Sequence, residues 1–292
     1  MQKLSPIEVS EICDELGEAY PKRVKQVHGG DIHSAWKIEF ENKQLFLKRN
    51  IMNKKYLEFE KYCLQNLKMY TNKKNLIVPE VIAYKNIKNI EILLIEWINI
   101  QNFDQKKLGK GLGEMHLNST ESSPGIYGYP VEGFIGITDQ KKGWENNWID
   151  CFLNLRIIPQ LSILKSNILD KETIKKVKEK IKSELRNHQP INALVHGDLW
   201  SGNVGVDKSG KGVIFDPASW WADNEVDIAM TKLFGGFRKE FYEEYHKIFP
   251  IKEGFEKRII IYNLYHVLNH ANMFGGSYLH QVRNYVKAIV NF

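Results

Sequence analysis

The sequence lacks the features that mark secreted, disulfide-bonded and zinc-finger proteins. Among its 292 residues are three cysteines, an odd number without any CxxC pair: Cys13, Cys63 and Cys151. We therefore expect a reducing compartment, no disulfide framework and no structural zinc. The first 16 residues, MQKLSPIEVSEICDEL, contain no apolar core of the kind a signal peptide needs. The sequence predicts a soluble, cytoplasmic protein.

Long apolar runs and blocks of arginine are also missing. The longest strongly apolar run, IEILLIEWI, is too short to cross a bilayer, so no membrane partner is expected. The formal net charge is +6, but the basic residues are mostly lysines spread among acids. No nucleic-acid-binding signature is present, and we expect no nucleic-acid partner. A mild basic excess remains compatible with phosphate-bearing small molecules.

The periodicity of apolar residues divides the chain in two. Strand-like segments at 23–30, 35–40, 44–50, 75–84 and 90–98 surround one helical stretch at 53–70. A further helix is expected to start at Ser5, because Pro6 and Glu8 complete a capping box. Beyond residue 98 most of the pattern is helical. The sequence predicts an α+β protein with a small N-terminal β-sheet lobe (1–98) that carries one helix and a larger, mainly helical C-terminal lobe (99–292).

The stretch LVHGDLWSGNVGVDKSGKGVIFDPASWW, residues 194–221, carries three polar side chains that packing does not explain. Asn203 follows Asp198 by five residues, and Asp216 follows Asp198 by eighteen. The first offset is that of the protein-kinase catalytic loop, H-R-D-x-x-x-x-N, and FDP stands where the kinase DFG would stand. Phosphoryl transfer needs a carboxylate at the attacking hydroxyl, here Asp198, and oxygen ligands for Mg²⁺, here Asn203 and Asp216. The alternative is an ordinary acidic, glycine-rich turn.

A site of this kind also needs a lysine on a strand and an acid on a helix of the first lobe. Lys48 lies within the strand-like segment QLFLKRN, and the helix offers Glu58 and Glu60. The two acids are roughly 200° apart around a helix, so they cannot both face inward. Glu60 falls on the apolar stripe, where an unpaired acid is costly. We therefore predict that Glu60 pairs with Lys48 and that Lys48 binds nucleotide phosphates.

The remaining candidates surround this centre. The segment HGGDIHSAW has Gly29 and Gly30 but no full G-x-G-x-x-G, and its place between two strands makes it the candidate phosphate loop. The backbone of Glu96, Trp97 and Ile98 lies where the chain crosses between lobes, beside the expected adenine site. His196 is expected to hold the catalytic loop through hydrogen bonds. Glu225 and Asp227 either favour a helix N-terminal dipole or, in the case of Asp227, brace the catalytic loop.

At this point the chain resembles the fructosamine/ketosamine-3-kinase family, relatives of the aminoglycoside phosphotransferases within the protein-kinase-like fold. The resemblance runs nearly end to end, and its narrowest parts are HGDLWSGN, FGGF and YHVLNH. It implies ATP-dependent phosphorylation of the 3-hydroxyl of a sugar joined to an amine as a ketosamine, such as a ribulosamine or fructosamine. The phosphorylated product breaks down and frees the amine, so the implied role is deglycation repair. Asp198 would be the base, Asn203 and Asp216 the Mg²⁺ ligands, and Lys48 and Glu60 the ion pair.

The sequence departs from the family pattern in three places. The loop GGDIHSAW lacks the cysteine that many relatives carry, so redox switching by that route is not expected. TDQKK replaces the frequent T-P-Q-P-N, which puts acceptor contacts near Gln140 in doubt. Asn224 stands where bacterial relatives often carry arginine.

The acceptor is the part of the function that the sequence specifies least. Trp200 follows the expected base by two residues and suits a sugar ring, although large aromatic side chains also build cores. One competing reading is another small-molecule kinase of the same fold, acting on an aminoglycoside, choline or a sugar, because the fold does not set the acceptor. Another is a nucleotide-binding pseudokinase.

Overall fold

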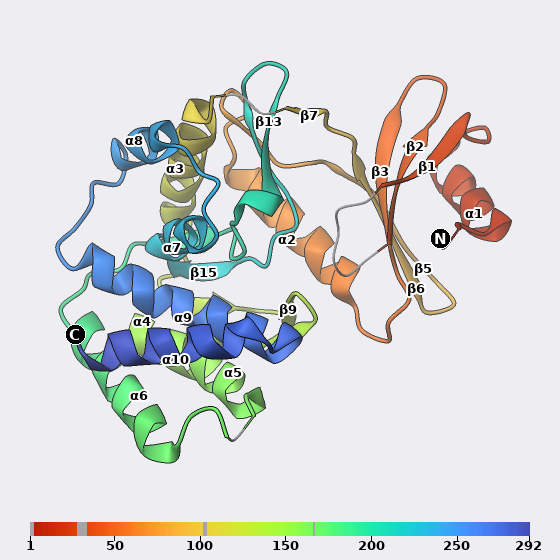
Figure 1. The fold of residues 1–292 in the computed structure, drawn as a ribbon. Coiled ribbons are helices and arrows are strands. Elements are labelled where there is room, and N and C mark those ends of the chain that lie inside the picture. Colours follow the sequence, from red (N-terminus) through yellow and green to blue (C-terminus); the bar gives the residue numbers. More distant parts are fainter. Residues whose placement is uncertain (1–2, 28–33, 102–103, 166) are drawn as a thin grey trace.

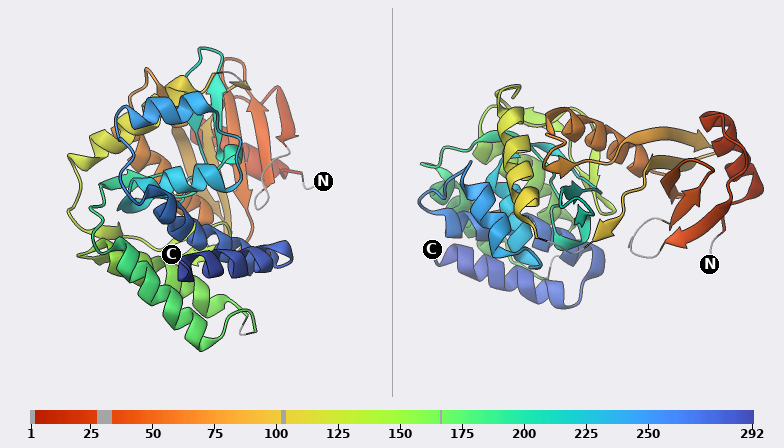
Figure 2. Two further views of the ribbon diagram at one scale, coloured as in Figure 1. Left: turned by 60° about the vertical axis from the view of Figure 1, so that its left-hand side comes forward. Right: turned by 90° about the horizontal axis from the view of Figure 1, so that it is seen from above.

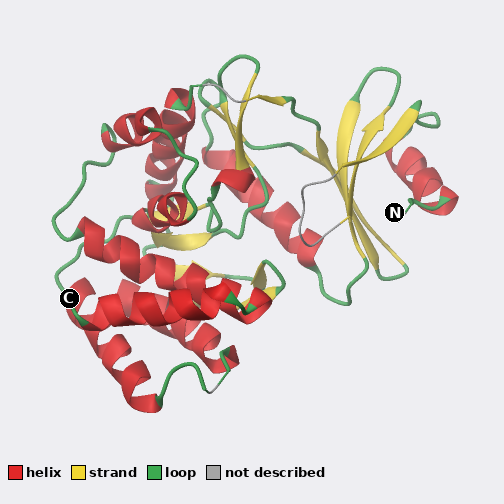
Figure 3. Cartoon of the chain, in the orientation of Figure 1, coloured by secondary structure: helices red, strands yellow, loops and turns green. Residues whose placement is uncertain are grey.

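The computed structural model describes residues 3–27, 34–101, 104–165 and 167–292. The N-terminal residues form a small β-sheet lobe, and the rest of the chain forms a larger, mainly helical lobe beside it (Figure 1). Coloured by secondary structure, the long strands gather at one end of the molecule, and most helices, with several short strands among them, lie at the other (Figure 3). The predicted two-lobed α+β fold is confirmed.

The N-terminal lobe is built on a five-stranded antiparallel sheet in the order β1-β2-β3-β6-β5. The strands are β1 (Arg23–Val27), β2 (Ser34–Glu39), β3 (Gln44–Asn50), β5 (Val81–Ile87) and β6 (Ile90–Glu96). Side chains alternate between its faces, as the pleat requires. Ile92 and Leu94 of β6 pack into one core cluster, and Leu93 and Ile95 pack into another.

A helix covers each face of this sheet. Helix α1 (Pro6–Leu16) packs on the face that carries Ile92 and Leu94, where it contributes Val9 and Ile12 to the core. Helix α2 (Tyr56–Tyr70) packs on the opposite face, which carries Leu93 and Ile95. The expected capping box of α1 is present, because Ser5 Oγ accepts from Glu8 N at 3.2 Å and Ser5 N donates to Glu8 Oε2 at 2.7 Å. The lobe therefore holds the predicted sheet-packed helix and the helix predicted to start at Ser5.

The C-terminal lobe packs its helices around one large core. The principal helices are α3 (Lys106–Thr120), α6 (Lys171–Leu185), α7 (Glu225–Leu233), α8 (Lys239–His246), α9 (Phe255–Phe274) and α10 (Ser277–Val290). Helix α9 is buried along most of its length between α7, α10 and α5 (Ile158–Ile163). The views in Figure 2 show α10 lying along the outside of this bundle. Among the described helices, none has the length and apolarity needed to cross a membrane.

Short strands connect the lobes and carry the catalytic stretch. One sheet has the order β4-β14-β13-β7 and joins β4 (Leu76–Ile77) and β7 (Ile100–Gln101) to β13 (Val204–Asp207) and β14 (Gly212–Ile214). Another has the order β11-β8-β15-β12 and contains β8 (Tyr127–Tyr129), β11 (Gly143–Glu145), β12 (Asn192–Val195) and β15 (Trp220–Asp223). Strand β4 precedes residue 98 but pairs with β14 of the second lobe, so one sheet contains strands from both sides of the expected boundary. The boundary near residue 98 stays a prediction.

The region 127–163 contains local structure that the sequence analysis did not anticipate. Besides β8 and β11 it holds the hairpin of β9 (Gly133–Ile135) and β10 (Thr138–Gln140). The helical part of this region consists of α4 (Trp148–Cys151) and α5, joined by a π-helical segment (Phe152–Ile157). Strands of three residues are too short to show an alternating pattern.

Candidate active site

A cavity of about 730 Å³ lies between the lobes and receives most of the predicted site residues. Its size is in the range of small-molecule sites. Nine of the candidates line it: Lys48, Glu60, Glu96, Trp97, Ile98, Asp198, Trp200, Asn203 and Asp216. His196 and Asp227 lie behind the catalytic loop, and Gly29 and Gly30 fall outside the described residues.

The loop that carries Asp198 begins where β12 ends and makes a tight turn at Gly197. Gly197 has φ +84°, and a Cβ at this position would lie 2.1 Å from the carbonyl oxygen of Ala218. Only glycine adopts this conformation without strain and leaves room for that carbonyl. A short 3₁₀ turn (Ser201–Asn203) then brings the Asn203 amide back, and its Nδ2 donates to the Asp198 main-chain oxygen at 2.9 Å.

Asp227, near the start of α7, fixes this loop from beneath. Its carboxylate accepts hydrogen bonds from the main-chain N–H of His196 at 2.7 Å and of Gly197 at 2.8 Å. Burial opposes ionisation, but the hydrogen bond from His116 and the charges around it lower the pKa of Asp227. The geometry favours the bracing interpretation over the helix-dipole interpretation.

His196 ties the catalytic loop to the segment that carries Asp216. Its Nδ1 accepts from Asp198 N at 3.3 Å, which leaves the proton on Nε2 to donate to Phe215 O at 2.9 Å. A second hydrogen bond joins the same two segments, because Ala218 N donates to His196 O at 2.9 Å. The burial of the ring lowers the pKa of His196 and keeps it neutral. This is the hydrogen-bonding role expected from the sequence.

Asp198 itself occupies a site that suits a base. The pKa of Asp198 is raised to about 7, mainly by burial and secondly by the nearby carboxylate of Asp216. Asn203 Nδ2 opposes this shift by donating to Asp198 Oδ2 at 3.2 Å. A base with a pKa near the working pH combines a large ionised fraction with a real affinity for a proton.

Asp216 is held in an unusual backbone conformation near Asp198. Its φ is +58°, a left-handed value that a non-glycine residue adopts at some cost and that clusters at functional sites. Its carboxylate faces Lys48 Nζ, which also contacts Glu60 Oε1 at 2.7 Å. Burial would lower the pKa of Lys48, but the charges of Asp216 and Glu60 outweigh it and raise the pKa. Lys48 is therefore held as a cation against two carboxyl groups, and burial raises the pKa of one of them, Glu60, to about 7.

The phase of α2 separates its two glutamates as the sequence suggested. The side chain of Glu60 is buried at the Lys48 contact, whereas Glu58 is more exposed and pairs with Lys55 at 2.8 Å. The structure thus brings Lys48, Glu60 and Asp216 together. Their action on a nucleotide stays a prediction.

The part of the cavity beside β6 is lined by apolar side chains. Ile95, Phe46, Ala35, Val27 and Val213 line it from both lobes. The crossing segment there is held to the sheet, because Glu96 N donates to Glu80 O at 2.9 Å. This lining is suited to a planar ring such as adenine.

The hairpin β9–β10 was not predicted from the sequence. It packs between α2 and the C-terminal lobe. The Tyr56 ring lies 4.3 Å from that of Phe134, and Tyr56 Oη donates to Ile137 O at 3.3 Å. At its other end the buried Gln140 donates to Ala218 O at 3.2 Å and accepts from Tyr265 Oη at 3.0 Å. Gln140 is therefore part of the scaffold behind Asp216 and is not among the residues that line the cavity.

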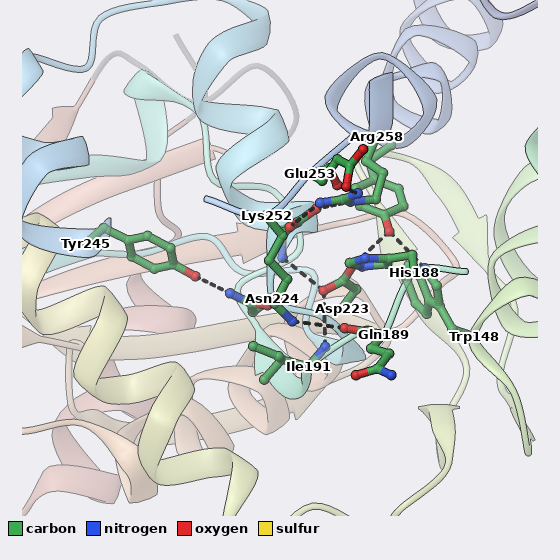
Figure 4. A network of polar contacts seen from close by, with 12 residues as sticks. Trp148, His188, Gln189, Ile191, Asp223, Asn224, Tyr245, Lys252, Glu253 and Arg258 are labelled. Atoms are coloured by element: carbon green, nitrogen blue, oxygen red, sulfur yellow. Dashed lines mark hydrogen bonds and ion pairs between the residues drawn. The ribbon is translucent and has the colours of Figure 1, made fainter. Parts of the chain in front are cut away.

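Two further polar groups behind the site carried no recognisable signal in the sequence. His116 of α3 is hydrogen-bonded to Asp227 at 3.1 Å and to Tyr245 at 2.9 Å. Around Asp223, Figure 4 shows a second network in which its carboxylate accepts from His188 at 2.6 Å. Glu225 belongs to this network and pairs with Arg258 through bonds of 2.6 and 2.9 Å. Since Arg258 already occupies both Glu225 oxygens, we interpret the network as structural.

Taken with the two-lobed fold, this site defines a phosphotransferase of the protein-kinase-like class. Aminoglycoside phosphotransferase APH(4)-Ia, solved with ADP and hygromycin B, shares this fold with a TM-score of 0.64 over 97% of each chain, at 14% identity. The chain belongs to the fructosamine kinase family, whose sequence model matches residues 7–292. The family resemblance is thereby confirmed.

Individual relatives agree over nearly the full length. A probable ketoamine kinase of Vibrio vulnificus is 34% identical over 275 residues, which is 92% of this chain and 93% of the relative. A probable ketoamine kinase of Vibrio cholerae is 32% identical over 292 residues, covering 98% and 99%. A crystal structure of a fructosamine-3-kinase candidate from Haemophilus somnus matches 96% of each chain with a TM-score of 0.84 and 26% identity.

Proposed function

We propose that this protein is a ketosamine kinase that transfers the γ-phosphoryl group of ATP to the 3-hydroxyl of a sugar joined to an amine. The observation that carries the proposal is the convergence of Asp198, Asn203, Asp216 and Lys48 on one cavity in a chain of this family. The solved phosphotransferase with ADP and hygromycin B bound supports a nucleotide and a small-molecule acceptor in such a fold. We place the reaction in the cytoplasm, where ATP is available and the three buried cysteines stay reduced.

Each residue has a defined task in this proposal. Asp198 accepts the proton of the attacking hydroxyl, and its raised pKa suits that task. Lys48 binds phosphate oxygens, and Glu60 holds it in place. The apolar end beside Glu96, Trp97 and Ile98 takes the adenine ring.

The residues of this site fit a magnesium ion. The Nδ2 of Asn203 donates to the main-chain oxygen of Asp198, so the side-chain oxygen of Asn203 is the atom that would bind a cation. Asp216 also lines the cavity and would supply a carboxylate ligand. Carboxylate and amide oxygens are ligands that Mg²⁺ accepts. When bound, the ion neutralises charge on the transferred phosphate.

Other functions have weaker support. The aminoglycoside phosphotransferases share 14% identity, which indicates the fold and leaves the acceptor open. A pseudokinase would be expected to have lost polar residues of the site, whereas Asp198, Asn203, Asp216, Lys48 and Glu60 are all present.

The direct test is an acceptor screen. Purified protein is incubated with Mg²⁺-ATP and, in turn, ribulosyl-lysine, fructosyl-lysine, ribose, choline and kanamycin, and ADP is measured with the phosphorylated product. We expect turnover with at least one ketosamine. Turnover of kanamycin or choline alone would leave a kinase with a different acceptor, and ATP binding without any turnover would favour the pseudokinase.

A further inference from the structure

The end of the cavity beyond the base carries exposed aromatic side chains that the phosphoryl transfer does not require. Phe234 follows α7, Phe274 ends α9 and Tyr278 lies in the first turn of α10; we call these three residues the aromatic rim. All three line the cavity, yet Phe274 is 54% exposed and Phe234 is 38% exposed. Adjacent exposed aromatic rings are a mark of a binding surface.

The rim is continuous with the catalytic centre. The Trp200 ring lies over Gly202, and a Cβ at Gly202 would lie 2.2 Å from that ring. The centroids of the Trp200 and Phe234 rings are 6.1 Å apart. The His270 ring then lies 5.0 Å from Phe234 and 5.7 Å from Phe274. The Tyr278 ring completes the row, because it lies 5.1 Å from His270 and 6.0 Å from Phe274. An acceptor with its hydroxyl at Asp198 and its sugar ring beside Trp200 would extend along this row toward solvent.

The chemistry of the row is apolar. None of its residues is an aspartate, glutamate, lysine or arginine, and Met273 adds a further apolar side chain to the same wall. Its histidine, His270, is kept neutral because burial lowers its pKa, and its Nδ1 donates to His266 O at 2.8 Å. Such a surface offers little to further sugar hydroxyls and much to an aromatic or aliphatic group.

We propose that the aromatic rim binds the group carried on the nitrogen of the ketosamine and selects amines with an aromatic ring or an extended aliphatic stem over short, charged amines. The inference rests on the proposed ketosamine kinase function. It assigns Phe234, Phe274 and Tyr278 as residues that determine specificity for the amine. The sugar and the phosphates are bound elsewhere in the cavity.

The test compares two acceptors that share one sugar. The ketosamines of benzylamine and of glycine are prepared from the same pentose, and kcat/KM is measured for each. We expect wild-type protein to prefer the benzylamine conjugate by roughly tenfold or more, the scale of one buried aromatic ring. Phe274→Ala should lower kcat/KM for the benzylamine conjugate by roughly three- to tenfold, mainly through KM, and leave the glycine conjugate within about twofold.

Two further variants make the comparison specific. Phe234→Ala should repeat the selective effect at the other side of the rim. Trp144→Ala removes an aromatic ring that is 39% exposed on β11 but does not line the cavity, and it should change neither acceptor. Equal kcat/KM for the two conjugates, or equal losses in Phe274→Ala, would overturn the inference while the proposed function stands. Failure to phosphorylate either conjugate or any ketosamine of the screen would overturn both.

Discussion

The two ends of the cavity differ in composition and in the way the chain builds them. The end that we propose binds the phosphates concentrates charge, with Lys48 between Glu60 and Asp216 and with Asp198 nearby. The acceptor end beyond Trp200 is a row of rings from the termini of three helices. The charged end is assembled from short motifs with fixed offsets, whereas the row of rings depends on how distant segments pack.

This difference separates chemistry from specificity. Phosphate, metal and proton place strict demands on residue type, and few side chains meet them. An apolar surface for an amine can be formed by many combinations of rings. Substitutions at the phosphate end should therefore affect every acceptor alike, whereas those at the acceptor end should discriminate between acceptors.

The largest effect is expected at the carboxylate opposite the base. Asp216→Ala should abolish turnover with all acceptors and weaken Mg²⁺-ATP binding, because Asp216 would be a ligand of the ion that neutralises charge on the phosphates. Asn203→Ala should act in the same direction but less severely, because a neutral amide oxygen is the weaker ligand. Nucleotide affinity is measured by calorimetry with and without Mg²⁺. Unchanged magnesium dependence in both variants would refute the metal assignment.

The base is expected to affect the rate and leave nucleotide binding nearly unchanged. Asp198→Asn should lower kcat by roughly 10²–10⁴, the range of general-base catalysis. Its affinity for ATP should stay close to that of wild type, because Asp198 faces the acceptor. Single-turnover measurements give the rate, and the same titration gives the affinity. Wild-type turnover would remove Asp198 from this role.

The two glutamates of α2 provide a matched pair. Glu60→Gln should lower kcat/KM by roughly 10–100-fold, as residues that orient a functional group do, because Lys48 loses one of its two anionic partners. Glu58→Gln removes a partly exposed acid that pairs with Lys55 and should be nearly silent. Thermal melting of both proteins separates a loss of activity from unfolding. The reverse ranking would show that the pairing of Lys48 with Glu60 is not the functional one.

A smaller effect is expected from pH. Because burial and Asp216 raise the pKa of Asp198 to about 7, the ionised base is lost as the pH falls through that value. Burial also raises the pKa of Glu60 to about 7, so two carboxylates of the site are lost over the same range, and the kcat/KM of the wild type should rise by at least about tenfold per unit below pH 7 and level off above it. Phe274→Ala should keep the same profile, since it lies at the acceptor end. A profile flat down to pH 5 would contradict the assigned environment of Asp198.

The sequence could predict the parts of this molecule whose signals are local. The capping box at Ser5, the alternating strands and the helical phase of Glu60 are set by neighbouring residues, and each has its expected counterpart in the structure. The offset between Asp198 and Asn203 is equally local, because one tight loop spans it. These features need no knowledge of distant segments.

The parts that escaped prediction depend on long-range packing. Asp227 is joined to His116 across 111 positions, and Gln140 is joined to Tyr265 across 125. The hairpin β9–β10 has strands of three residues, too short for any periodicity to show. The aromatic rim likewise becomes visible only when α7, α9 and α10 converge. Sequence reasoning named Trp200 alone because Trp200 lies beside the base.

The central claim is that the acceptor is a ketosamine phosphorylated on its 3-hydroxyl. It is tested most directly by identifying the product by phosphorus–proton correlation NMR after reaction of ribulosyl-lysine or fructosyl-lysine with ATP. We expect a phosphate coupled to the proton on carbon 3 of the sugar, followed by release of the free amine as the product breaks down. A phosphate on any other hydroxyl, or an unmodified ketosamine beside a phosphorylated aminoglycoside or choline, would contradict it.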